Sequence, residues 1–106
     1  MRVLFDQGTP VPLRTYLASH HVTTVYELGW SGLKNGDLLD RAEESGYEAI
    51  VTTDQSIRYQ QNLPGRRLAI AVLMATSWPR IERHVADVVI QIDRLQQGGY
   101  LEIAIP

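Results

Sequence analysis

The chain has 106 residues, a hydrophobic fraction of 44% and a formal net charge of −2, which indicates one globular domain over residues 1–106. It contains no cysteine, so disulfides, zinc–thiolate sites and thiol nucleophiles are excluded. Because the charge is close to zero, there is no global basic field, and nucleic acid would have to bind at a local patch.

The sequence carries no sign of membrane insertion or export. No apolar run approaches the roughly 18 residues that a membrane-spanning helix needs. The opening residues, MRVLFDQ, lead directly into an apolar strand without the features of a signal peptide. We therefore expect a soluble, cytoplasmic protein.

The N-terminal part of the chain predicts a strand followed by a helix. Residues 2–5 (RVLF) form a short apolar run that is typical of a buried strand, and Asp6 follows it directly. Thr9 is suited to cap a helix that has Pro10 in its first position and continues to about Ser19. This first unit therefore places an acidic residue at the carboxyl end of a strand.

The next unit repeats the order of strand and helix. Residues 22–25 (VTTV) are largely β-branched and predict a second strand, and the glycine-containing residues 27–36 predict an irregular connection. Asn35 is suited to cap a helix over residues 36–45, whose first turn contains Asp37. A second acidic residue therefore lies where a helix begins.

The remaining elements complete an alternating pattern. Residues 48–53 predict a third strand that ends at Asp54, and the polar residues 55–67 predict a loop with a short helix. The apolar run 68–74 is typical of a central strand buried on both faces. The last elements are a long helix with one apolar face and a final strand, over residues 78–97 and 100–105.

This alternation predicts an α/β protein, namely a three-layer α/β/α domain with a mainly parallel central sheet. In such sheets, functional groups gather beyond the carboxyl ends of the strands. Asp6 and Asp54 each follow a strand, and Asp37 begins a helix that starts at the same edge. We therefore expect these three carboxylates to lie close together.

Three neighbouring carboxylates repel one another unless a cation neutralises them, and oxygen ligands favour a hard ion such as Mg²⁺ or Mn²⁺. A metal ion held in this way can polarise a phosphoryl oxygen and activate water to attack a phosphodiester. The pattern thus favours a metal-dependent phosphodiester hydrolase with Asp6, Asp37 and Asp54 as catalytic and metal-binding residues.

Each acidic residue also has a structural interpretation. Asp6 can cap the turn after its strand, Asp54 can form an Asx turn, and Asp37 can complement the helix dipole. Only the convergence of all three favours a metal site. Glu27 is a further candidate metal ligand, and its alternative role is that of a solvated loop acid.

Basic and aromatic residues near the predicted site are candidates for substrate binding. Lys34 and Arg58 could steer phosphate, and Tyr59 could stack on a base. These last two residues belong to a polar run over residues 55–62, and a loop ordered by its own amides is the alternative interpretation of that run.

Three segments together resemble a known family: RVLFDQGTPVPL, LGWSGLKNGDLLDRAEESGYEAIVTTDQS and RYQQNLPGRRLAI. They resemble a short PIN-like domain family whose members are described as toxin components of VapC-like toxin–antitoxin modules. The resemblance runs from residue 1 to about residue 75. It implies a PIN-like fold, Mg²⁺-dependent ribonuclease activity, metal-binding acids at positions 6, 37 and 54, an RNA substrate and an antitoxin partner.

The sequence departs from the family pattern at two positions. PIN nucleases usually have four acidic residues, whereas Gln7 and Ser56 stand where relatives have a second and a further acid. These departures leave open a catalytically inactive module that binds protein or RNA, and a homodimer is compatible with either function. A phosphoacceptor receiver domain is disfavoured, because it needs a paired acid after the first strand and a lysine after the last, and Lys34 is the only lysine.

Overall fold

The computed structural model describes residues 1–59 and 63–106 of the chain. Its centre is a five-stranded sheet in which each pair of neighbouring strands is parallel. The strands follow the order β2-β1-β3-β4-β5, and the predicted α/β class with a parallel sheet is confirmed. Their bounds are β1 (Arg2–Phe5), β2 (His21–Thr24), β3 (Ala49–Thr52), β4 (Ala69–Leu73) and β5 (Tyr100–Ile103).

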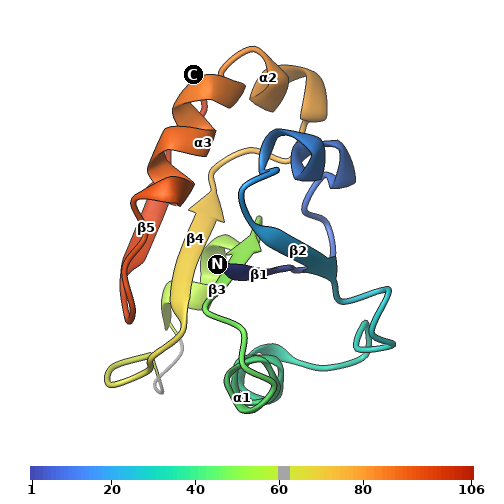
Figure 1. The fold of residues 1–106 in the computed structure, drawn as a ribbon, viewed down its shortest axis with the longest axis vertical. Helices are drawn as coiled ribbons and strands as arrows, with labels where there is room; N and C mark the ends of the chain where they lie inside the picture. The colour runs from blue at the N-terminus through green and yellow to red at the C-terminus, as the bar shows by residue number, and fades with distance from the viewer. Residues whose placement is uncertain (60–62) are drawn as a thin grey trace.

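Helical segments cover both faces of the sheet, which gives three layers (Figure 1). One face is covered by the 3₁₀ helix η1 (Val11–Tyr16) and the helices α2 (Trp78–Glu82) and α3 (Val85–Asp93). The other face is covered by α1 (Asn35–Glu44) and the 3₁₀ helix η2 (Gln55–Tyr59). No helix among the described residues is long and apolar enough to cross a membrane.

The alternation of side chains along the strands produces two separate hydrophobic layers. In β1, Val3 and Phe5 point to the layer beneath η1, α2 and α3, whereas Leu4 points to the layer beneath α1. The strands β3 and β4 are buried along their whole length, and for β4 the continuous apolar run predicted this. The sheet is therefore packed on both faces, and its carboxyl edge lies between two hydrophobic layers.

The first predicted helix forms only as the short 3₁₀ helix η1, and Thr9 does not cap it. The residue before η1 is Pro10, and no side chain caps its first turn. Thr9 is instead buried, and its hydroxyl donates a hydrogen bond of 2.9 Å to the carbonyl of Val51. This contact ties the turn after β1 to strand β3, so Thr9 stabilises the sheet edge rather than a helix.

The long helix predicted over residues 78–97 is divided into α2 and α3. The break lies at Arg83 and His84, where no proline or glycine signals it. Ser77 caps α2 by accepting a hydrogen bond of 3.5 Å from the backbone of Arg80. The predicted apolar face is nonetheless correct, because the buried residues of both helices pack into one core, namely Ile81, Val88 and Ile92.

The strand order creates a switch point between β1 and β3. From β1 the chain moves outward to β2 on one side, and from β3 it continues to β4 and β5 on the other. In open parallel sheets, ligands bind outside the carboxyl ends of the strands at this point. Asp6 follows β1 directly, and Asp54 is the second residue after the end of β3.

Candidate functional site

Asp6 is held in place directly after β1. Its backbone N–H donates a hydrogen bond of 2.9 Å to the carbonyl of Val51, which continues the pairing of β1 with β3. Its carboxylate accepts hydrogen bonds of 2.8 Å from the backbone of Gln7 and 2.8 Å from the hydroxyl of Thr52. The Asp6 side chain is therefore oriented by both strands at the switch point.

Asp54 is oriented by the turn that follows β3. One carboxylate oxygen accepts hydrogen bonds from Ser56, of 2.9 Å from its backbone and 2.6 Å from its hydroxyl. The backbone N–H of Asp54 donates to the hydroxyl of Thr52 at 3.0 Å. Because the same hydroxyl donates to Asp6, the fully buried Thr52 links the two acidic residues.

The surroundings shift the pKa values of these two carboxyl groups in opposite directions. Burial raises the pKa of Asp6, the hydrogen bonds from Thr52 and Gln7 oppose this rise, and the charge of Asp54 adds to it. The hydrogen bond from the Ser56 hydroxyl lowers the pKa of Asp54, against the effect of burial. Two neighbouring carboxyl groups thus differ in proton affinity, which is typical of functional pairs.

Asn35 is a member of this site that the sequence did not identify as one. Lys34 occupies the cap position of α1, so Asn35 is the first helical residue and not the predicted cap. The side chain of Asn35 contributes a hydrogen bond that helps to lower the pKa of Asp54. The signal available in the sequence was a polar residue in the first turn of a helix that begins at the carboxyl edge.

Asp37 does not join Asp6 and Asp54. It is exposed in the first turn of α1 and lines a shallow hollow with Asp40, Arg41 and Glu44. Residues two positions apart on an α-helix are rotated by about 200°, so when Asn35 faces Asp54 the residue at 37 faces away. Within residues 1–59 and 63–106 there is no group of three or more acidic or histidine side chains that could hold a metal ion. The expected cluster of three carboxylates is therefore a pair.

Glu27 lies near Asp6 but has other partners. Its carboxylate accepts hydrogen bonds of 2.9 Å from the backbone of Thr24 and 2.7 Å from the guanidinium of Arg14. The hydrogen bond from Thr24 and then that from Arg14 lower the pKa of Glu27. Both Glu27 and Asp6 line a hollow of about 350 Å³, so Glu27 belongs to its wall.

The predicted substrate-binding residues fall into two groups. Lys34 is exposed and directly precedes Asn35, which places it beside the site. Arg58 and Tyr59 are occupied with each other, because the Arg58 guanidinium lies 4.8 Å from the Tyr59 ring centroid and donates to its hydroxyl at 2.6 Å. The rest of the predicted polar run, residues 60–62, lies outside the described residues.

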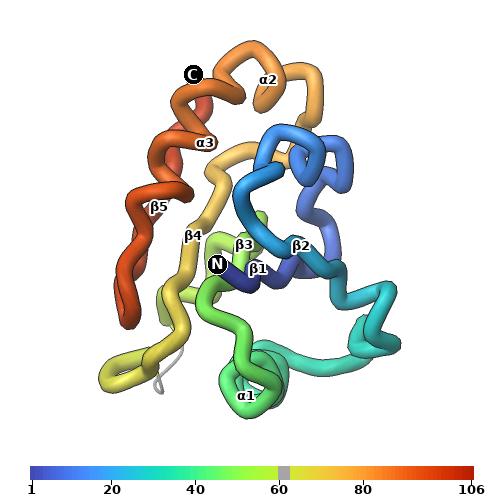
Figure 2. Tube along the Cα trace, in the orientation of Figure 1, coloured from blue at the N-terminus to red at the C-terminus, as the bar shows by residue number. Residues whose placement is uncertain are grey.

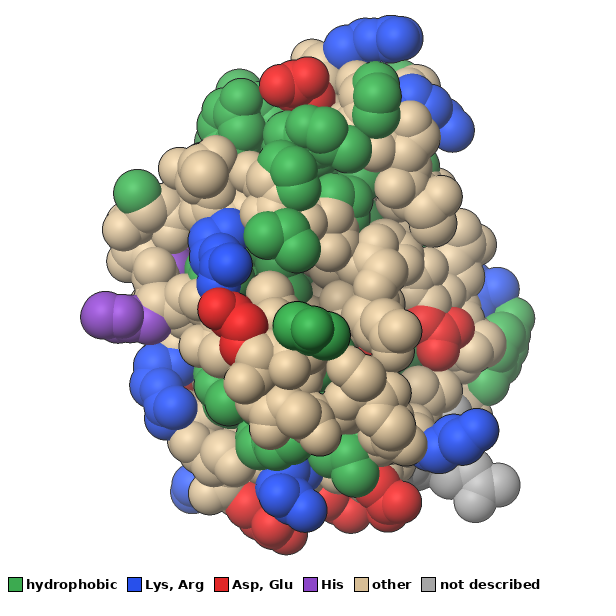
Figure 3. All heavy atoms as spheres, turned by 90° about the vertical axis from the view of Figure 1, so that its right-hand side faces the viewer, with side chains coloured by type: hydrophobic (Ala, Val, Ile, Leu, Met, Phe, Trp, Pro, Cys, Tyr) green, Lys and Arg blue, Asp and Glu red, His purple; other side chains and the backbone are tan. Residues whose placement is uncertain are grey.

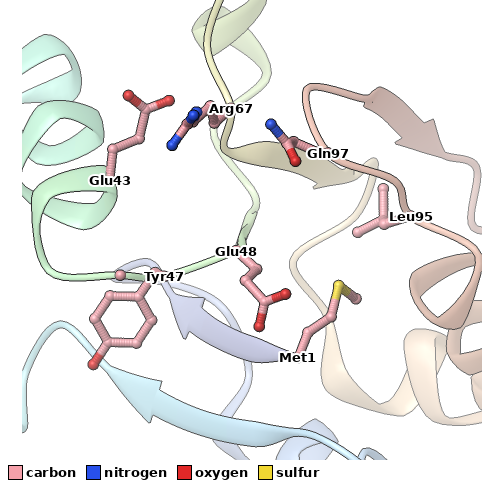
Figure 4. A pocket seen from close by; sticks show the side chains of 8 residues that line it. Met1, Glu43, Tyr47, Glu48, Arg67, Leu95 and Gln97 are labelled. Carbon is pink, nitrogen blue, oxygen red and sulfur yellow. The ribbon is translucent and has the colours of Figure 1, made fainter.

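A larger cavity of about 530 Å³ lies at the opposite edge of the sheet (Figure 4). Its lining includes Met1, Glu48 and Arg67, which stand just before β1, β3 and β4. This edge carries the amino ends of the strands, whereas ligands of parallel sheets bind at the carboxyl ends. Asp6 and Asp54 therefore remain the candidate site.

Comparison of the chain with protein-family models, with curated proteins and with solved structures finds no significant match. The resemblance to PIN-like domains therefore stays a prediction from the sequence.

Proposed function

We propose that the chain is a PIN-like, metal-dependent endoribonuclease in which Asp6 and Asp54 bind one divalent cation, Mg²⁺ or Mn²⁺. The observation that carries this proposal is that Asp6 and Asp54 lie together at the switch point of a parallel sheet, where the Thr52 hydroxyl joins the Asp6 carboxylate to the Asp54 backbone. The charge of Asp54 raises the pKa of Asp6, and a cation between them would relieve this repulsion.

The donor set fits a hard cation. The pair offers carboxylate oxygens, which are the ligands that Mg²⁺ and Mn²⁺ prefer. The known bonds to the two carboxylates come from Gln7, Thr52, Ser56 and Asn35, so no arginine or lysine occupies them among the described residues. Two acidic residues suffice for Mg²⁺, which commonly keeps several water ligands.

The residues of the chain have distinct roles in this proposal. When bound, the cation would polarise a phosphoryl oxygen and lower the pKa of a water molecule. Asp6 and Asp54 hold the cation, and Thr52 fixes the carboxylate of one and the backbone of the other. Asn35 and Ser56 orient Asp54. Control of this activity by an antitoxin is a further part of the proposal, and it rests on the family resemblance.

A second candidate function is that of an inactive PIN-like module that binds protein or RNA. The specific observation in its favour is that the described residues gather two acids where the sequence predicted three, with Gln7 and Ser56 in place of others. The two candidates differ in whether the acidic pair supports hydrolysis.

A cleavage assay separates them. Purified wild-type protein should cut a single-stranded RNA in Mg²⁺ or Mn²⁺ and lose this activity in EDTA. Asp6→Asn and Asp54→Asn should reduce cleavage to the metal-free background, whereas Asp87→Asn, on the exposed surface of α3, should not. Cleavage by Asp6→Asn at the wild-type rate would show that the acidic pair is not the catalytic site.

A further inference from the structure

The hollow beside Asp6 has three walls. The turn after β1 contributes Asp6 and Gln7, η1 contributes Val11 and Arg14, and the segment after β2 contributes Tyr26 together with Glu27. Figure 2 shows this last segment leaving β2 and looping outward before the chain enters α1. With a volume of about 350 Å³, the hollow is large enough for one small ligand group.

Tyr26 stands at the rim of this hollow with 84% of its surface exposed, more than any other large hydrophobic residue in the described part of the chain. Its turn is nevertheless ordered, because Thr24 and Glu27 exchange hydrogen bonds of 2.9 and 3.1 Å. The next residue inward, Val25, is buried. A hydrogen-bonded turn thus presents an aromatic ring to solvent, and this ring is not part of the core.

Arg14 completes the hollow with a positive charge. Its Nη1 atom donates a hydrogen bond of 2.7 Å to the carboxylate of Glu27 and one of 3.4 Å to the carbonyl of Val22. Among the described residues, both hydrogen bonds that this guanidinium donates come from Nη1, so Nη2 and Nε have no protein acceptor there. An arginine with two such guanidinium nitrogens can bind a phosphate through both of them.

The surface around the hollow does not favour a duplex. Figure 3 shows the face on which Figure 1 draws β2 and the segment after it, and Lys and Arg side chains are dispersed there among acidic and hydrophobic ones. Duplex binding depends on many phosphate contacts, whereas single strands gain affinity from bases that stack on aromatic rings. One exposed tyrosine and one arginine match the second mode.

We propose that this hollow seats one nucleotide of a single-stranded nucleic acid, with its base on Tyr26 and its phosphate at Arg14. The inference deepens the proposed function, because a strand held there passes Asp6, which lines the same hollow. Asp6 repels phosphate in the absence of a cation, and Glu27 offsets part of the charge of Arg14. The affinity of the metal-free protein therefore comes mainly from Tyr26, and Arg14 adds to it.

The test measures binding without metal or cleavage. Fluorescence anisotropy in EDTA measures how Asp6→Asn protein binds a labelled single-stranded oligoribonucleotide. This parent variant lacks the one carboxylate of the hollow that has no arginine partner among the described residues. When Tyr26→Ala is introduced into the Asp6→Asn protein, the dissociation constant should rise about fivefold or more, which is the effect of losing one stacking contact. Tyr26→Phe should restore the affinity. Tyr16→Ala removes another exposed tyrosine, outside the hollow, and should leave binding unchanged.

The outcomes distinguish this inference from the proposed hydrolysis. The inference is overturned if Asp6→Asn protein binds the single strand equally well with and without Tyr26→Ala. It is also overturned if Asp6→Asn protein binds a duplex as tightly as a single strand. Because Tyr26 is exposed, circular dichroism should show an unchanged fold in its variants. If Tyr26-dependent binding is found but the wild-type protein cuts no RNA in Mn²⁺, the hydrolase proposal fails and the nucleotide site stands.

Discussion

Asp6 and Asp54 carry the same functional group and differ in their surroundings. Asp6 is half-buried, so water stabilises its charge poorly, whereas Ser56 donates two hydrogen bonds to Asp54. The folded protein therefore holds the proton of Asp6 more tightly than the unfolded chain does. For Asp54 the opposite is true.

These shifts give stability contributions of opposite sign. Asp54 stabilises the fold above its unfolded-state pKa, near 3.8, and this contribution is lost as the pH falls through its lower folded-state value. Asp6 costs stability as the pH rises from 3.8 through its raised pKa. In Asp54→Asn, the pKa of Asp6 should fall, because a repelling charge is removed. Carboxyl carbon NMR titration measures this change, and an unchanged or higher pKa would contradict the proximity of the two groups.

Thr52 is the residue through which the two acids are connected. Thr52→Val removes the donor to Asp6 and the acceptor for the Asp54 backbone. We expect a loss of about 1–3 kcal/mol in the free energy of unfolding, measured by urea denaturation, and a further rise in the pKa of Asp6. Thr23→Val, on the edge strand β2, serves as the control and should change stability little. Equal stability of both variants would show that the Thr52 hydroxyl does not link the site.

At the scale of elements, the first turn of α1 decides which side chain meets Asp54. The sequence predicted that this helix starts at the carboxyl edge, which is correct, but it did not show the rotation of the helix about its axis. An error of one residue in the start of a helix rotates the expected face by about 100°. Asn35 was therefore predicted as a cap and Asp37 as a ligand, whereas Asn35 is the first helical residue and is the one whose side chain helps to lower the pKa of Asp54.

The placement of Asn35 can be tested by giving it a charge. Asn35→Asp would create the three-acid cluster that the sequence predicted at another position, and an acid is also favoured in the first turn of a helix. Affinity for Mn²⁺ should rise on the order of tenfold, since ligand charge tunes such sites. Isothermal titration calorimetry measures it. Gln96→Glu adds a charge beyond the end of α3 and should have no effect; an equal gain there would point to a general charge effect.

Other elements show the same limit of local sequence patterns. Runs of apolar or β-branched residues identified each of the five strands, and the signal is strong where a strand is buried on both faces, as β4 is. The break between α2 and α3 has no such signal, since residues on both sides of it keep the predicted apolar face. Thr9 is a residue type that often caps helices, but here its hydroxyl donates a hydrogen bond to the carbonyl of Val51. This contact joins residues that are distant in sequence, so no local pattern signals it.

At the scale of the molecule, the strand order β2-β1-β3-β4-β5 brings the two acids together. The alternation of strands and helices predicted a parallel sheet, and general rules for such sheets placed the site at its carboxyl edge. Arg14 and Tyr26, which line the hollow beside Asp6, were not predicted. They lie on irregular segments whose path depends on tertiary packing.

Calorimetric titration of the wild-type protein with Mn²⁺ tests the central claim, that Asp6 and Asp54 together bind a divalent cation. We expect saturable binding of one ion per chain, and no binding in Asp6→Asn or Asp54→Asn protein that circular dichroism shows to be folded. Folded wild-type protein that gives no saturable heat up to millimolar Mn²⁺, or variants that bind the ion as tightly as the wild type, would contradict it.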